Sequence, residues 1–310
     1  MEKDTIYSGI IGAAVADALG VPYEFSSRSK MKKHPATTMT GHGMYNQPVG
    51  TWSDDTSLTL ATIDSITNSI NLEDMMEKFC QWYLESKYTA NGVVFDIGVT
   101  TREALINHIQ YNIRATRCGL NGKRDNGNGS LMRILPITLY NHAKELTMKE
   151  QIKLIDSVSS LTHAHPISKA SCNIYNMIIQ EILNNKECDL KELIHRGIDR
   201  SRRYYENSMY PCFENLYNHV LECEEDELFS MGYVVNSLEV AVYCSYHSSS
   251  YSRSVLKAVN FGGDTDTNAM ITGGLTGLYY GISSIPCEWM KKTAKIDFVK
   301  SLCDRFYESL

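Results

Sequence analysis

The chain has 310 residues, of which 43% are hydrophobic and 21% are charged, and its formal net charge is −6 at pH 7. This composition is typical of a globular protein with a large core and excludes an intrinsically disordered chain. The acidic balance gives no general attraction to nucleic acid or to an anionic membrane, so partners have to be inferred from individual sites. Neither a linker nor a change in composition divides the chain, and we therefore expect a single domain over residues 1–310.

Hydrophobic periodicity predicts helices along the chain. Apolar residues recur at intervals of three to five residues within 10–19, 58–66 and 105–109. Residues 233–244 contain several valines, yet the apolar positions there lie four apart, as on one face of a helix. No strand-like alternation or fixed-period repeat stands out. The predicted fold class is therefore all-α, a compact domain of many helices.

Two segments need a separate interpretation. Residues 269–284 carry no charge and are nearly long enough to suggest a membrane span, but they contain four glycines among threonines and serines. We expect a buried helix packed closely through its glycines, and no membrane. Residues 184–227 are polar with runs of charge, which is typical of solvated helix faces and turns, and we assign them no chemistry.

The cysteines and the first residues bear on the cellular compartment. Nine cysteines are scattered without a CxxC pair or a Cys/His zinc spacing, which favours reduced thiols. Residues 1–4 (MEKD) do not begin the pattern of a secretory signal, which is a charged region followed by an apolar stretch. We therefore expect a cytoplasmic protein. No association stripe is evident, so a monomer is the default expectation.

The first motif with candidate chemistry is residues 50–56 (GTWSDDT). It places two adjacent carboxylates, Asp54 and Asp55, directly before an apolar-periodic helix that begins near Leu58. Ser, Thr and Asp side chains often cap a helix by accepting hydrogen bonds from its free N–H groups, and negative charge is favourable at that end. Capping is the better explanation of this segment taken alone.

A second segment, residues 261–268 (FGGDTDTN), repeats the arrangement before a long apolar helix. The capping alternative makes Asp266 the N-cap. The glycines allow close approach of a ligand, however, and Asp264, Asp266 and Thr267 form a compact group of oxygen donors. If the two segments meet in space, four carboxylates converge and their mutual repulsion demands cations. Oxygen-only ligands favour Mg²⁺, Mn²⁺ or Ca²⁺ over zinc.

Two weaker motifs lie between these segments. Residues 126–133 (NGNGSLMR) form a glycine-rich turn that runs into a helical pattern, where backbone N–H groups can receive a phosphate. An ordinary turn is the alternative. Residues 162–166 (THAHP) contain two histidines, one of which could face a ligand, although surface and core histidines are commoner.

Together and in this order, the motifs resemble the ADP-ribosylglycohydrolase family, which includes the dinitrogenase reductase-activating glycohydrolase and the ADP-ribosyl-acceptor hydrolases. The resemblance spans most of the chain. Its parts are ADALG at 16–20, YEF at 23–25, SDDT at 53–56, FDIG at 95–98, GNG at 127–129 followed by Met132 and Arg133, Thr162 with His163, and GGDTDT at 262–267. Two positions depart from the usual pattern: Ser53 replaces a threonine but keeps the hydroxyl, and Ala16 replaces a glycine.

The resemblance implies an all-α fold with a cleft that holds two divalent cations, Mg²⁺ or Mn²⁺. It also implies the metal ligands, which would be the oxygen-bearing residues of the two acidic motifs. These residues are Ser53, Asp54, Asp55, Asp264, Asp266 and Thr267.

The same resemblance implies the residues that contact the substrate. Glu24 would lie near the scissile bond, and residues of the 125–129 segment with His163 would line the ADP-ribose site. In full, the implied substrate-binding residues are Asp125, Asn126, Gly127, Asn128, Gly129 and His163. Asp96, in an FDIG context that looks like the arginine-directed branch, is a candidate for proton transfer. Glu24, Asp55 and Asp96 are the expected acid and base groups.

The expected reaction is hydrolysis of the bond between ADP-ribose and an acceptor, with arginine on a protein as the favoured acceptor. The substrate is thus an ADP-ribosylated protein or small molecule, and no feature indicates direct nucleic-acid binding. Alternatives are another acceptor, such as serine, a nucleobase or a small O-linked compound, a non-catalytic ADP-ribose-binding relative, and a phosphoester hydrolase that attacks the pyrophosphate. Free ADP-ribose as the product, rather than AMP, distinguishes the first reaction from the last.

Overall fold

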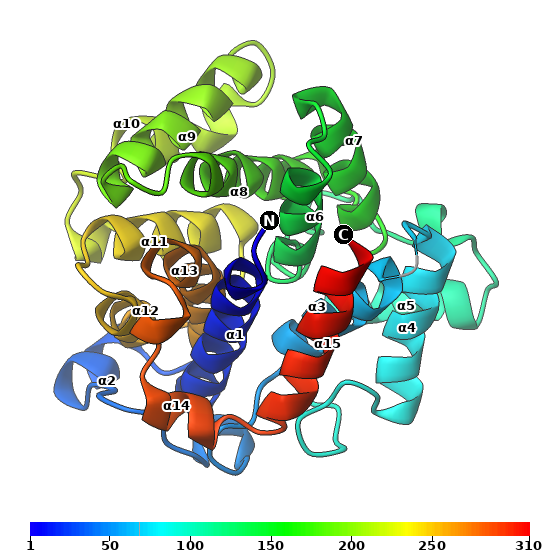
Figure 1. Ribbon diagram of the computed structural model, residues 1–310, viewed down its shortest axis with the longest axis horizontal. Helices are drawn as coiled ribbons and strands as arrows, with labels where there is room; N and C mark the ends of the chain where they lie inside the picture. Colours follow the sequence, from blue (N-terminus) through cyan, green and yellow to red (C-terminus); the bar gives the residue numbers. More distant parts are fainter. Residues whose placement is uncertain (68) are drawn as a thin grey trace.

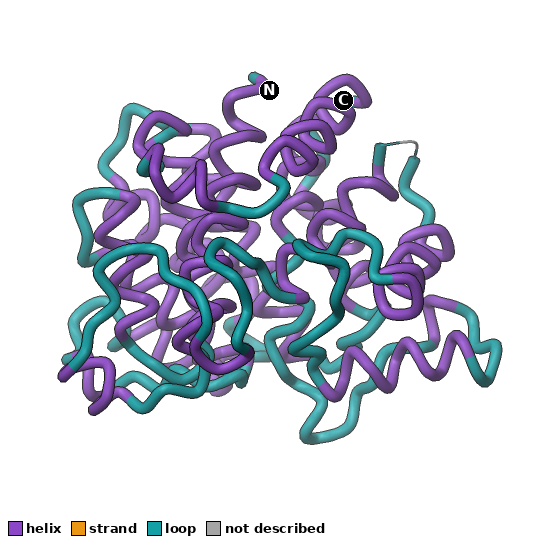
Figure 2. The backbone as a smooth tube through the Cα atoms, turned by 90° about the horizontal axis from the view of Figure 1, so that it is seen from below, coloured by secondary structure: helices purple, strands orange, loops and turns teal. Residues whose placement is uncertain are grey.

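The computed structural model describes residues 1–67 and 69–310, and these form α-helices joined by loops and short 3-10 helices without a β-sheet. Figure 2 shows the same absence of strands along the described backbone. The all-α prediction is therefore confirmed. The helices are α1 (Lys3–Gly20), α2 (Arg28–Lys33), α3 (Asp54–Ile66), α4 (Leu72–Glu85), α5 (Val99–Ile109), α6 (Leu135–Ala143), α7 (Met148–Ser159), α8 (Pro166–Asn184), α9 (Leu190–Tyr205), α10 (Glu214–Asn218), α11 (Val234–Tyr246), α12 (Tyr251–Asn260), α13 (Thr265–Tyr280), α14 (Cys287–Lys292) and α15 (Ile296–Ser309).

Six 3-10 helices lie in the connections. They are η1 (Val21–Tyr23), η2 (Gly43–Tyr45), η3 (Ala115–Arg117), η4 (Tyr210–Phe213), η5 (Glu225–Glu227) and η6 (Ile282–Ser284).

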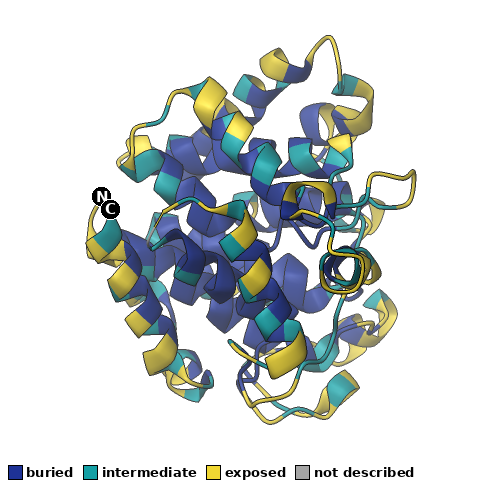
Figure 3. Ribbon diagram, turned by 90° about the vertical axis from the view of Figure 1, so that its right-hand side faces the viewer, coloured by how far each residue is buried: buried dark blue, intermediate teal, exposed yellow. Residues whose placement is uncertain are grey.

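The centre of the protein is the pair formed by α1 and α13, which pack side by side although they lie at opposite ends of the sequence (Figure 1). Both helices are buried over most of their length, and the exposed residues lie towards the outside of the molecule (Figure 3). A Cβ atom on Gly277 would lie 2.2 Å from the carbonyl oxygen of Ser8, so only glycine permits this approach of the two backbones. The expected buried, glycine-packed helix over 269–284 is thus confirmed for residues 269–280, which form most of α13. Gly281 ends that helix at a φ of 82°, and residues 282–284 belong to η6.

The stretch Lys3–Tyr23, which contains the first helix, is long and apolar enough to cross a membrane by length and composition alone. Of its most apolar 18 residues, however, 89% are buried inside the protein. Core helices of globular proteins commonly show these properties, and the helices that pack against α1 here are α3, α6, α12, α13, α14 and α15. Its apolar character is accounted for by this packing.

The valine-rich segment 233–244 forms the helix α11, as its four-residue spacing predicts. The helices α8, α11 and α12 pack against α13, and the N-terminus of α13, at Asp264 and Thr267, borders an open space. The N-termini of α3 and α5 open towards the same place. The fold therefore directs several helix N-termini, each carrying partial positive charge, towards one cleft.

Candidate active site

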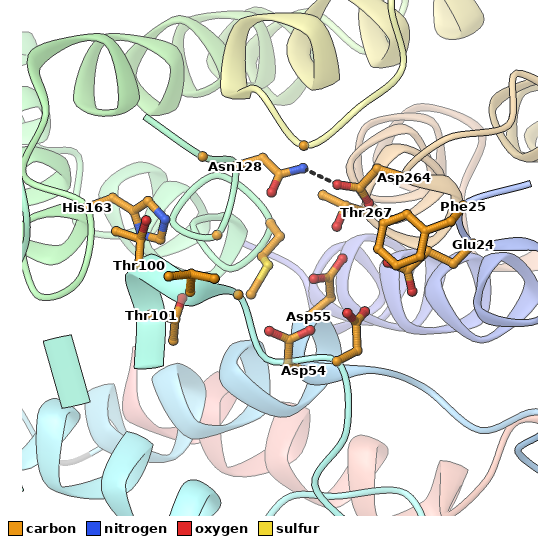
Figure 4. Close-up of a pocket in the computed structure, with 17 residues that line it drawn as sticks. Glu24, Phe25, Asp54, Asp55, Thr100, Thr101, Asn128, His163, Asp264 and Thr267 are labelled. Carbon is orange, nitrogen blue, oxygen red and sulfur yellow. Dashed lines mark hydrogen bonds between the residues drawn. The ribbon is translucent and has the colours of Figure 1, made fainter. Parts of the chain in front are cut away.

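A cleft of about 270 Å³ lies where these helix N-termini meet the turn after α1. Figure 4 shows carboxylates on one side of it and the glycine-rich segment with His163 on the other. The lining residues are Glu24, Phe25, Asp54, Asp55, Asp96, Gly98, Val99, Thr100, Thr101, Gly127, Asn128, Gly129, Met132, His163, Gly232, Asp264 and Thr267. Motifs separated by more than 200 residues in the sequence therefore line one cleft.

In the first acidic motif, one residue caps a helix and two others line the cleft. Ser53 is the N-cap of α3, and its hydroxyl oxygen accepts a hydrogen bond from the backbone N–H of Asp55 at 3.2 Å. Asp54 and Asp55 occupy the first turn and are buried, with their carboxylates lining the cleft. Capping thus accounts for Ser53, which does not itself line the cleft, but not for the two aspartates.

Asp17 on α1 holds this motif in place. Its buried carboxylate accepts hydrogen bonds from the backbone N–H of Ser53 at 3.0 Å and from both the N–H and the hydroxyl of Thr56 at 3.0 and 2.5 Å. Burial raises the pKa of Asp17 to about 6, although the hydrogen bonds from Thr56 and Ser53 act to lower it. The sequence marks Asp17 as part of a family motif, but this structural role depends on the contact between α1 and α3.

The second acidic motif begins α13. Its N-cap is Asp264, whose side chain makes no capping bond and instead accepts a hydrogen bond from the Asn128 amide at 2.8 Å (Figure 4). The expectation that Asp266 is the N-cap is wrong, because Asp266 lies inside the first turn and its Oδ1 accepts from the N–H of Thr267 at 2.9 Å. The other oxygen of Asp266 is buried without a partner.

The acidic groups of the two motifs and Glu24 form one cluster. One carboxylate oxygen each of Glu24, Asp264 and Asp266 lies within 4.8 Å of the other two. One oxygen each of Glu24, Asp55 and Asp266 is buried without a hydrogen-bond partner. The resemblance assigns Glu24 only to the scissile bond, so its proximity to this group is an addition from the structure.

The electrostatics of the cluster favour neutralisation. Burial first, and then the charges of Asp96 and Asp264, raise the pKa of Glu24 to about 10. Burial and the neighbouring carboxylates likewise raise the pKa values of Asp55 and Asp266 far above the usual range. Carboxylates in this situation bind protons or cations. Partnerless buried oxygens with no nitrogen or sulfur ligand among them suit a hard divalent cation.

Asp96 enters the cleft from the loop before α5, and its backbone is held in the left-handed region at a φ of 54°. The hydroxyl of Tyr45, in η2, donates to its Oδ1 at 2.7 Å, and the rings of Tyr45 and Phe95 lie 5.1 Å apart. Burial and the adjacent Asp96 raise the pKa of Tyr45 far above its usual value, so the phenol stays protonated and donates. Tyr45 has no signal in the sequence, because its contact with Asp96 spans 51 residues.

His163 borders the glycine-rich segment on the opposite side. A Cβ atom on Gly129 would lie 2.7 Å from the imidazole Cε1, so this glycine permits the close approach. The buried guanidinium of Arg133 donates to the Thr162 hydroxyl at 2.6 Å, and that hydroxyl lies 2.8 Å from His163 Nδ1. The buried Thr162 hydroxyl has no other acceptor for its proton among the described residues, so this proton points to Nδ1 and the imidazole proton is placed on Nε2.

The charge state of His163 follows from the same neighbours. Burial, and secondarily the positive charge of Arg133, lower the pKa of His163 to about 3. The imidazole is therefore neutral at physiological pH and offers the cleft an Nε2–H donor. This assigns a role to Arg133 and Thr162, which the sequence marks only as motif residues.

The remaining predicted substrate-binding residues lie in different environments. Gly127, Asn128 and Gly129 line the cleft, whereas Asp125 and Asn126 are not among the lining residues. The carboxylate of Asp125 accepts from the N–H of Gly122 at 2.7 Å and closes a turn. Contact of these five residues with substrate stays a prediction.

The N-terminus of α5 was not predicted from the sequence. Its N-cap is Gly98, which has no side chain that could cap the helix, and residues 98–101 line the cleft. The hydroxyl of Thr101 is buried without a hydrogen-bond partner. A signal was present, since Val99 and two threonines follow the FDIG motif at the start of the helix, and helix starts with free N–H groups bind anions.

The comparison with protein families decides the identity of this arrangement, because the ADP-ribosylglycohydrolase model matches residues 2–310. The chain belongs to the ADP-ribosylglycohydrolase family. The family resemblance seen in the motifs is thereby confirmed over nearly the whole chain, and the cleft is where the motifs of this ADP-ribosylglycohydrolase meet.

Relatives with assigned activities resemble this ADP-ribosylglycohydrolase over most of their length. The ADP-ribosylarginine hydrolase Tri1 of Serratia proteamaculans strain 568 is 29% identical over 98% of this chain and 79% of its own. The ADP-ribosyl-[dinitrogen reductase] glycohydrolase of Rhodospirillum rubrum is 25% identical over 93% and 90%. A solved ADP-ribosylglycohydrolase-related protein complex superposes with a TM-score of 0.80 at 24% identity over 99% of both chains, which shows the shared fold.

Proposed function

We propose that this protein is a metal-dependent hydrolase that releases ADP-ribose from ADP-ribosylated arginine on a protein. Hydrolysis of a glycosidic bond to ADP-ribose is the activity of the family and of the named relatives. The observation that carries the proposal is that oxygens of Glu24, Asp264 and Asp266 lie within 4.8 Å of one another, at a cleft that Glu24 and Asp264 line together with Asp54 and Asp55. Arginine as acceptor is supported by the similarity to Tri1 and by the context of Asp96.

The residues fit two divalent cations, Mg²⁺ or Mn²⁺. Asp54, Asp55, Asp264, Asp266 and Thr267 would hold them, with Ser53 as a further hydroxyl, and Glu24 is close enough to take part. When bound, such ions neutralise the carboxylates, orient ribose hydroxyls and lower the pKa of a water molecule.

The protein's own groups can provide the acid–base steps. Breaking the bond between the ribose anomeric carbon and the guanidine nitrogen develops positive charge on the sugar, which nearby carboxylates stabilise. Water adds to the anomeric carbon and gives up a proton, and the departing guanidine takes one. We assign these transfers to Asp55, Glu24 and Asp96. The Tyr45 hydroxyl donates to Oδ1 of Asp96, which leaves Oδ2 of Asp96 available to accept a proton.

The opposite side of the cleft would hold the diphosphate. The neutral His163 offers an Nε2–H donor, the N-terminus of α5 offers free N–H groups, and Thr101 offers an unpaired hydroxyl. These groups favour an anion without requiring a charged side chain. With the carboxylates opposite, they orient the substrate so that its ribose, not its pyrophosphate, faces the acidic cluster.

The experiment that tests the proposal uses the purified protein with Mg²⁺ or Mn²⁺ and two peptides, one ADP-ribosylated on arginine and one on serine. Mass spectrometry follows the products. Release of free ADP-ribose from the arginine peptide alone supports the proposal, and release from serine alone overturns the acceptor assignment. AMP as product indicates a phosphoester hydrolase, whereas ADP-ribose binding without release from these peptides or from nucleobase-linked and small O-linked substrates indicates a non-catalytic relative.

A further inference from the structure

A hydrophobic pair lies exposed beside the cleft and makes no contribution to the core. Phe229 and Met231 are 72% and 53% exposed, and they flank Ser230, which is buried. This alternation is that of extended backbone, in which successive side chains point to opposite sides. Two large apolar side chains presented together on a surface are typical of a binding site for a partner.

The segment that carries this pair is fixed to the rest of the protein. The guanidinium of Arg28 donates to the carbonyl oxygens of Glu225 and Leu228, each at 2.7 Å. The carbonyl oxygen of Ser230 accepts from the N–H of Asp264 at 2.8 Å and from the amide of Asn268 at 2.9 Å. The exposed pair is therefore held directly by the helix that carries the acidic cluster.

The pair is continuous with the cleft through Phe25. A hollow of about 480 Å³ is lined by Phe25, Arg28, Phe229, Met231 and Phe261 among others, and Phe25 also lines the cleft. Phe25 is 53% exposed, has a φ of 56°, and follows Glu24 directly (Figure 4). A chain that leaves the cleft beside Glu24 passes over Phe25 and reaches the exposed pair.

The charges next to the pair select the kind of partner. Glu222, Glu224 and Glu227 precede Phe229 and are exposed, and no described residue forms an ion pair with them; Lys30 and Lys33 of α2 are likewise exposed without a carboxylate partner among the described residues. Of the other two acidic groups there, Asp226 pairs with Lys32 and Glu225 with Lys257. The unpaired carboxylates outnumber the unpaired lysines by three to two, so the local balance is acidic and favours a basic polypeptide over a phosphate backbone.

We propose that Phe25, Phe229 and Met231 form a docking surface for the polypeptide segment that carries the modified arginine. The preferred segment is basic and has a large apolar residue close to the arginine, so that this residue packs on the exposed pair while the ADP-ribosyl group occupies the cleft. The inference rests on the proposed function, because that function supplies a polypeptide acceptor at the mouth of the cleft.

The test measures kcat/KM for three substrates: free ADP-ribosylarginine, a basic peptide with leucine near the modified arginine, and the same peptide with serine in place of leucine. Wild-type protein is compared with Phe229→Ser and Phe229→Ser/Met231→Ser. Burial of one apolar side chain predicts a preference of about tenfold for the leucine peptide in the wild type, expressed in KM. The double variant should lose that preference and keep its kcat and its rate on free ADP-ribosylarginine.

The matched control is Tyr111→Ser, which removes a similarly exposed aromatic residue beyond the far end of α5 and should keep the preference. A double variant that still prefers the leucine peptide overturns the inference. So does an oligomer that dissociates in Phe229→Ser, which assigns the surface to a second copy. If no form of the protein hydrolyses ADP-ribosylarginine, the proposed function fails separately. Fluorescence anisotropy with the unmodified leucine peptide and a DNA oligonucleotide then decides: loss of peptide binding in the double variant supports the surface, and equal peptide binding or preference for DNA overturns it.

Discussion

Replacing Asp266 by asparagine should separate metal binding from the stability of the fold. The side chain is 1% exposed, one oxygen accepts from the N–H of Thr267, and the other has no partner and lies close to Glu24 and Asp264. Asparagine keeps the shape and the bond to Thr267 but removes one negative charge from a crowded cluster. In the absence of metal, the variant should therefore melt at the same temperature as wild type or higher.

The size of the metal-induced rise in the Tm of the wild type follows from the linkage between binding and folding. A ligand that binds only the folded state stabilises it by about 2.7 kcal/mol at a concentration one hundred times its Kd. For a protein somewhat smaller than this one, each kcal/mol moves Tm by about 2–4 °C. A chain of 310 residues lies at the lower end of that range. Saturating Mg²⁺ or Mn²⁺ should thus raise the wild-type Tm by about 5 °C.

The assay is thermal unfolding followed by fluorescence, on protein treated with a chelator and then titrated with each metal. Asp266→Asn should show little or none of the increase in Tm. The control is Glu239→Gln on α11, a buried carboxylate outside the cleft that accepts from Asn215 at 2.9 Å, and it should keep the increase of about 5 °C. A full metal-induced increase in Asp266→Asn, or a drop of several degrees in its metal-free Tm, would refute the reasoning.

Three further predictions concern pH and individual side chains. Because the folded protein raises the pKa of Asp17 to about 6 and that of Glu24 to about 10, their stabilising contribution is full below pH ~4 and is lost as pH rises through those values. Urea unfolding of the metal-free protein at pH 5 and pH 8 should show lower stability at pH 8, and the opposite order would contradict this. Asp96→Asn should reduce kcat on ADP-ribosylarginine by about 10²-fold or more while calorimetry shows unchanged ADP-ribose affinity; an unchanged kcat removes Asp96 from the mechanism. Thr101→Val should leave Tm unchanged, since the hydroxyl has no protein partner, and weaken ADP-ribose binding by about 2- to 10-fold; unchanged binding would show that the hydroxyl does not contact the ligand.

The sequence predicts those parts of the site that local patterns specify. Serine and aspartate directly before an apolar run mark the start of α3, and the glycine–aspartate segment marks the start of α13. Their residue types also indicate the chemistry, because several carboxylates at buried helix starts are difficult to explain by capping alone. The helical fold class follows equally from periodicity, as the formation of α11 from a valine-rich segment illustrates.

The parts that the sequence does not predict depend on contacts between distant elements. The carboxylate of Asp17 supports α3 only because α1 packs beside the N-terminus of α3, and Tyr45 reaches Asp96 only because η2 packs against η1, the turn after α1. The protonated nitrogen of His163 depends on a chain of two hydrogen bonds from Arg133. None of these arrangements has a local sequence signature, since each is set by tertiary packing.

The pairing of the first helix with the thirteenth has a consequence for the protein during its synthesis. The Thr265 hydroxyl bonds to the carbonyl oxygen of Gly20 across 245 residues, and the acidic cluster joins Glu24 to Asp266 over a similar separation. Ribosomes deliver the chain from its N-terminus, so α1 emerges long before the helix that covers it. The nascent chain therefore has neither a complete core nor the acidic cluster until residues 265–280 have been synthesised. A product truncated before α13 lacks Asp264 and Asp266 and therefore cannot form the cluster.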